Sequence, residues 1–80
     1  MAQEAIVKKF GQAIRRRRVE AGLSQENLAA AAKVHPTYVS LIERGLRDPK
    51  LTSIRKLAKA LGTDASSLIE DAERARSRSR

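Results

Sequence analysis

Apolar residues recur every three to four positions along most of the chain, which is the spacing of one face of an α-helix. Two short segments in the middle, Gln25 to about Ala32 and about Pro36 to Arg44, show this spacing and also carry helix-start signals. Ser24 stands where its hydroxyl can cap the first segment. Pro36 stands at the first helical position of the second, where its missing N–H costs nothing. The pattern predicts two helices joined by a tight turn.

The second of these helices has an apolar stripe, Val39 and Ile42, and a face left over. The side chains on or beside that outer face are hydroxyls, a leucine, a guanidinium and an aromatic ring: Thr37, Ser40, Leu41, Arg44 and Tyr38. Such groups suit contacts with base edges in a DNA groove, so the pattern predicts a helix-turn-helix whose second helix enters the major groove. The alternative is an ordinary solvated helix face with one exposed leucine.

Three further helices are predicted around this pair, giving an all-α fold of five short helices. They span about Glu4 to Ala21, about Leu51 to Leu61, and a segment that Asp64 caps. In the second of these, the apolar face is predicted to contain Leu51, Ile54, Leu57, Ala58 and Leu61, and the opposite face Arg55, Lys56 and Lys59. In the turn between the central helices, Lys33 is strained if it adopts the left-handed conformation that such turns usually need.

Arg18 falls on the core side of the first predicted helix, in register with Val7, Phe10 and Ile14. A guanidinium in that position needs a carboxylate partner. Glu43, at the end of the second central helix, is the candidate. The sequence therefore predicts a structural ion pair between the first helix and the helix expected to enter the groove.

An apolar patch towards the C-terminus, formed by Leu61, Leu68 and Ile69, has two interpretations. It forms a dimer contact, or it packs back onto the first and fourth helices. The last residues, ERARSRSR from Glu73 onward, contain no large apolar side chain and are predicted to be disordered. The expected organisation is one DNA-binding domain over 1–72 and a basic tail over 73–80, which either adds sequence-independent attraction to DNA or does nothing.

Composition narrows the choice of function. The net charge of +8 favours a nucleic-acid binder, but four arginines lie in the last seven residues, and without them the charge becomes +4. The chain has no cysteine, one histidine, no glycine-rich phosphate loop and no clustered carboxylates, so we expect no enzyme, no metal site and no cofactor. The start MAQEAIVKKF lacks a long apolar run, which predicts a cytoplasmic protein without a signal peptide or membrane span.

Several motifs in correct mutual spacing resemble one known family. The run LSQENLA, the following turn, TYVSLIERG, the downstream DP and LTSIRKLAKALG resemble the Cro/repressor helix-turn-helix family, also called the xenobiotic-response-element family, over about Phe10 to Ile69. Within that family, HPTYVSLIERG is similar to the controller proteins of restriction–modification systems. The resemblance implies a five-helix, lambda-repressor-like DNA-binding domain.

The resemblance also implies roles for individual positions. Gln25 matches a residue that contacts a backbone phosphate, and Tyr38 matches one near the operator centre. The remaining matched positions face bases or phosphates: Pro36, Thr37, Ser40, Leu41, Arg44 and Arg47. Arg18 and Glu43 match a buried ion pair.

Two positions depart from the family pattern. Lys33 replaces the usual turn glycine, which costs about 1–2 kcal/mol if the turn is left-handed. Pro36 replaces a long polar side chain in many relatives, so base contacts are expected to shift to Thr37, Ser40 and Arg44.

Together these features predict a transcriptional regulator that binds a palindromic operator as a homodimer, because one groove-binding helix covers few base pairs. The expected partners are double-stranded DNA and a second copy of the chain, with no membrane; a toxin or RNA polymerase is a further candidate. The nearest alternative is the DNA-binding antitoxin of a toxin–antitoxin pair. Two others are a helical adaptor without DNA binding, and an RNA or anionic-membrane binder acting through basic residues alone.

Overall fold

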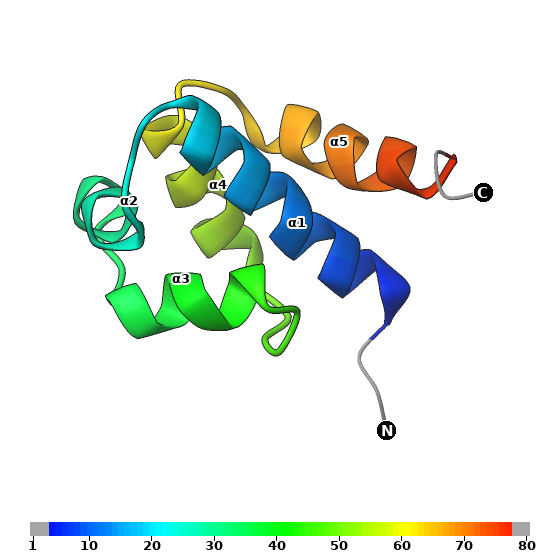
Figure 1. Cartoon of the computed structure of the whole chain (residues 1–80), viewed down its shortest axis with the longest axis horizontal. Coiled ribbons are helices and arrows are strands. Elements are labelled where there is room, and N and C mark those ends of the chain that lie inside the picture. Colours follow the sequence, from blue (N-terminus) through cyan, green and yellow to red (C-terminus); the bar gives the residue numbers. More distant parts are fainter. Residues whose placement is uncertain (1–3, 78–80) are drawn as a thin grey trace.

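The computed structural model describes residues 4–77, and the side chains of residues 4–74. Over this range the chain is all-α, as predicted. Its five helices are α1 (Ala5–Glu20), α2 (Gln25–Ala32), α3 (Pro36–Glu43), α4 (Leu51–Ala60) and α5 (Ala65–Ser77). Helix α1 packs against both α5 and α3, whereas α2 packs on α3 and α4 (Figure 1).

Three helices begin at side-chain caps, two of which, Ser24 and Asp64, the sequence indicated. The Ser24 hydroxyl, the His35 Nδ1 and the Asp64 carboxylate each accept a hydrogen bond from a backbone N–H two or three residues further along, at 2.9–3.0 Å. Each cap satisfies a donor that the first turn of a helix leaves unpaired. The caps therefore define where α2, α3 and α5 start.

The turn between α2 and α3 is left-handed at Lys33, with φ 60° and ψ 45°, so the residue that replaces the usual turn glycine adopts the strained conformation. The N–H of the next residue, Val34, donates to the Ala29 carbonyl at 3.0 Å and closes the end of α2. The half-buried Val34 side chain packs against the core. This turn sets the direction in which α3 leaves α2. The left-handed conformation of Lys33 costs about 1–2 kcal/mol relative to an unstrained residue.

Every helix contributes to one aliphatic core. The largest fully buried side chains are Ile14, Leu28, Val39, Ile42, Leu57 and Leu68. Two of these six belong to α3, so burial of one stripe of α3 contributes heavily to the core. The opposite face of the same helix is thereby turned outward.

A close backbone approach joins α1 to α3 at Gly11. A Cβ atom at this position would lie 2.1 Å from the Ile42 carbonyl oxygen, which is far inside van der Waals contact. Only glycine permits this separation of the two helices. The sequence analysis did not identify Gly11, because nothing in a helical pattern distinguishes a crossing point from any other glycine.

Two leucines lie elsewhere than the sequence pattern predicted. Leu68, assigned to a dimer contact, is fully buried in the core, because α5 packs this face onto α1 and α4. Its alternative interpretation, packing within the chain, is the correct one. Leu51, assigned to the apolar face of α4, is 72% exposed because it is the first residue of the helix and extends beyond the core.

The predicted onset of disorder at Glu73 is also wrong, because α5 continues as far as Ser77. Buried Ala72 holds this part of α5 against the core. Arg74 donates to Glu70 at 2.9 Å, an i,i+4 pair that supports the exposed side of the helix. Of the basic tail, Arg78 to Arg80 lie outside the described residues.

Candidate nucleic-acid interface

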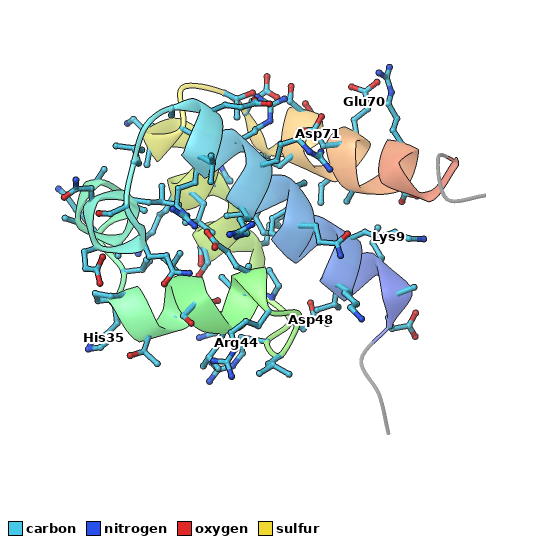
Figure 2. The ribbon with its side chains drawn as sticks, viewed as in Figure 1. Lys9, His35, Arg44, Asp48, Glu70 and Asp71 are labelled. Atoms are coloured by element: carbon cyan, nitrogen blue, oxygen red, sulfur yellow. The ribbon has the colours of Figure 1, made fainter. Side chains whose placement is uncertain are left out.

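Helix α3 presents a continuous outer face that no other element covers. Val39 and Ile42 are completely buried, whereas Pro36, Thr37 and Arg44 are exposed. The three predicted contact residues between them, Tyr38, Ser40 and Leu41, are partly exposed. In Figure 2, His35 at the start of α3 and Arg44 at its end both point away from the bundle.

The predicted ion pair between Arg18 and Glu43 is present and nearly buried. Arg18 Nε donates to Glu43 Oε2 at 2.6 Å and Nη2 donates to Oε1 at 3.1 Å, while Nη1 donates to the Leu23 carbonyl at 2.9 Å. The Arg18 and Glu43 side chains are 11% and 2% exposed. The hydrogen bond to Glu43 raises the pKa of Arg18 above its ordinary value, although burial acts in the opposite direction. The pair anchors the end of α3 to α1.

Gln25, at the first position of α2, belongs to the same network. Its Nε2 donates to Glu43 Oε1 at 3.0 Å, so one carboxylate orients both a guanidinium and an amide. Its second Nε2 hydrogen and the free N–H groups at the start of α2 remain as donors of the kind that bind phosphate. The contact between Gln25 and a phosphate stays a prediction.

Tyr38 connects α3 to the start of α4, a role that the sequence analysis missed. Its hydroxyl donates to Ser53 Oγ at 3.1 Å and accepts from the Lys50 N–H at 3.4 Å. The available signal was Ser53, a polar residue at a buried position of α4, which requires a hydrogen-bond partner. The Arg47 guanidinium lies 5.5 Å from the centroid of the Tyr38 ring, within the range of a cation–π interaction.

Exposed cations gather near the end of α3. Arg44 and Arg47 are both exposed and take part in none of the ion pairs between described side chains. Both are therefore available to an anionic partner beside α3. A second basic group, Arg55, Lys56 and Lys59, lies exposed on α4, as the sequence pattern indicated.

The candidate dimer surface changes once Leu68 is assigned to the core. Ile69 is 39% exposed and Leu61 is half-buried. Two large apolar residues that the sequence analysis did not select, Leu46 and Leu51, are 52% and 72% exposed. The apolar surface available to a second copy thus includes Leu46 and Leu51, near the junction of α3 and α4.

The described part of the chain contains neither a cluster of metal-binding side chains nor a candidate membrane span. Across residues 4–77, no three His, Asp or Glu side chains come together as a metal ion would require. None of the helices in that range has the length and apolar character needed to cross a bilayer.

Comparison with known proteins identifies the same architecture. A family model described as "Helix-turn-helix" matches residues 14–68. The control protein C.BamHI of Bacillus amyloliquefaciens is 44% identical over 62 residues, covering 76% of each chain. The restriction–modification controller C.AhdI of Aeromonas hydrophila superposes with a TM-score of 0.79 and 43% identity, covering 81% of this chain and 98% of that one.

A complex with DNA is known for a structural neighbour of lower sequence identity. The restriction–modification controller C.Esp1396I, solved as a tetramer with its natural 35-base-pair operator, superposes with a TM-score of 0.82 and 28% identity, covering 90% of this chain and 95% of that one. The fold agrees with these matches, and the family model alone covers more than half of the chain. The chain therefore belongs to the helix-turn-helix family of DNA-binding transcriptional regulators.

Proposed function

We propose that this protein is a sequence-specific regulator that binds a palindromic operator as a homodimer, with α3 in the major groove. The observation that carries the proposal is the division of α3 into a buried stripe, Val39 and Ile42, and an uncovered face with Thr37 and Arg44. An α-helix with short polar side chains and a guanidinium on one face suits the width and donor–acceptor pattern of that groove.

The proposed contacts divide by their chemistry. Thr37 and Ser40 bond base edges, and Leu41 packs on a thymine methyl group. Pro36 has no side-chain donor and contributes shape only. Phosphates or bases beside the helix are contacted by Gln25, Arg44 and Arg47. Tyr38 lies near the operator centre. These assignments follow from the family resemblance and the outward placement of α3. Phosphate contacts set the register of the protein on DNA, whereas the base contacts provide discrimination.

Two protomers are needed because one α3 helix spans few base pairs. A two-fold symmetric pair places two copies of α3 about one turn of DNA apart, roughly 10 base pairs. Exposed Leu51 and Ile69, with half-buried Leu61, are the proposed apolar contacts between protomers. Occupancy of the operator then rises with the concentration of the dimer, so the protein controls its targets through its own abundance.

The similarity to C.BamHI and C.AhdI supports a narrower proposal, namely that the controlled genes belong to a restriction–modification system. The relatives reported above are controllers, so the antitoxin alternative gains no support from them. An adaptor that has lost DNA binding is disfavoured, because the outer face of α3 carries hydroxyls and a guanidinium rather than an apolar or acidic surface.

Selection from a pool of random 35-base-pair duplexes tests the function, followed by gel-shift titration of the selected duplex at two salt concentrations. We expect a palindrome with two half-sites about one turn apart, and a logarithm of affinity that falls linearly with the logarithm of salt concentration. Binding of all sequences with equal affinity would contradict the proposal and would favour attraction through basic residues alone.

A further inference from the structure

Lys8 of α1 lies against the turn that ends α3. A Cβ atom built on Gly45 would be 3.2 Å from the Cα and Cγ atoms of Lys8 and 3.3 Å from its Cβ atom, so the stem of Lys8 follows the backbone of this turn. Gly45 also has a φ of +74°, a conformation that L side chains rarely adopt. Glycine here thus permits both the turn and the close approach of Lys8.

The ammonium group of Lys8 is available to an external anion beside the turn that ends α3. Lys8 is exposed, and it takes part in none of the ion pairs between described side chains. Arg44 lies at the end of α3 and Asp48 in the following loop (Figure 2), and the same loop contains Arg47. Together, Lys8, Arg44, Arg47 and Asp48 carry a net charge of about +2.

The dimensions of the major groove indicate which part of the DNA the end of α3 would face. The major groove is about 12 Å wide, and a helix with its side chains is about 10–12 Å across. A helix seated there fills the groove, and the phosphates of the groove walls run along its flanks and past its ends. A cation packed on the end of the helix therefore faces the sugar–phosphate backbone rather than a base.

We infer that Lys8 binds a backbone phosphate of the duplex that receives α3, and so extends the DNA interface beyond the helix-turn-helix to the first helix. The inference rests on the proposed function. It assigns Lys8 a sequence-independent role: the contact strengthens binding and holds α1 against the DNA, and it contributes nothing to the choice of base.

The test compares Lys8→Gln with Lys9→Gln. The two substitutions remove the same charge from adjacent positions, but Lys9 points away from α3 in Figure 2. The probes are the duplex selected by the wild-type protein and a scrambled duplex of the same length, each titrated from 50 to 200 mM salt. Thermal melting of all variants checks that the fold is intact.

For Lys8→Gln, we expect the slope of log affinity against log salt to become less negative by about 0.9 for each protomer, or about 1.8 for a homodimer, on both duplexes. Lys8→Arg should retain the wild-type slope, and Lys9→Gln should change it little. Equal effects of Lys8→Gln and Lys9→Gln would overturn the inference, because they would show a general loss of charge.

The same measurements separate this inference from the function on which it rests. If the wild-type protein selects a palindrome but Lys8→Gln keeps the wild-type slope, only the role of Lys8 is wrong. If the wild-type protein binds no duplex, the proposed function fails and the inference fails with it.

Discussion

Glu43 is the residue at which three helices meet. From the end of α3, its carboxylate accepts hydrogen bonds from Arg18 of α1 and Gln25 of α2, and its side chain is 2% exposed. A buried ion pair of this kind adds little net stability over an apolar replacement, but removal of one partner leaves an uncompensated charge. Glu43 therefore matters for the position of α3 more than for the strength of the core.

Replacement of this carboxylate gives the prediction at the residue scale. Glu43→Ala leaves Arg18 buried without its partner, which costs about 3–5 kcal/mol of unfolding free energy. In a domain of this size that lowers the melting temperature by at least about 12 °C. The measurement is a thermal melt followed by circular dichroism. Glu26→Ala, on the exposed side of α2, serves as the control, and a Glu43→Ala melt that matches this control would show the pair to be dispensable.

At the scale of elements, α3 is positioned by contacts from three sides. Gly11 lets α1 approach its backbone, the Tyr38–Ser53 hydrogen bond connects it to α4, and the left-handed turn at Lys33 connects it to α2. Every one of these contacts holds the buried side of the helix or its ends. These contacts therefore leave the outer face of α3 uncovered.

The crossing of α1 and α3 gives a prediction at this scale. Gly11→Ala forces the two helices apart, because the added methyl group would meet backbone rather than a movable side chain. We expect a loss of at least about 1–3 kcal/mol in urea unfolding, despite the better helix propensity of alanine.

Gln12→Ala, one position further along α1 and exposed, is the matched control and should be close to neutral. Equal stability of Gly11→Ala and the control would mean that the helices are not in close contact. DNA affinity of any folded fraction of Gly11→Ala is also expected to fall, because α3 changes its angle to α1.

At the scale of the whole molecule, the core is closed by α5 lying alongside α1 (Figure 1). Leu68 and Ala72 fill the interface, and Arg17 Nε donates to Asp71 Oδ2 at 2.6 Å at its edge. Because α5 uses Leu68 for this purpose, the surface left for a second protomer includes residues near the start of α4 and the outer side of α5. In the proposed dimer, the exposed contacts Leu51 and Ile69 are therefore distinct from the side chains that fill the core, whereas half-buried Leu61 contributes to both.

This separation predicts that dimers can be disrupted without unfolding. Leu51→Glu places a charge in the proposed dimer contact at a position 72% exposed in the monomer, so the melting temperature of the monomer should change little. Sedimentation equilibrium should show a shift from dimer to monomer, and gel-shift titration a loss of affinity for the palindrome. Val19→Glu, at an exposed valine on α1, is the control and should remain dimeric. A Leu51→Glu variant that sediments as wild type would place the dimer contact elsewhere.

Local features were predictable from the sequence because they depend on neighbours in the chain. The caps at Ser24 and Asp64 and the bounds of α2 follow from residue type and spacing, and the structure confirms them. Even the Arg18–Glu43 pair could be predicted, because a charged residue in register with an apolar stripe demands a partner.

Other features depended on how helices distant in sequence pack together, which no local pattern contains. Periodicity could not tell whether Leu68 faces the core or a second protomer, or that Leu51 extends past the core, because both positions satisfy the same helical spacing. Nor could it distinguish Gly11 as a crossing point or bring Lys8 to the end of α3. The sequence by itself determined the five helices, the starts of α2 and α5 and the outward face of α3, but not the end of α5. Only the tertiary structure decided which residues lie beside α3, because those distances arise when the whole core closes.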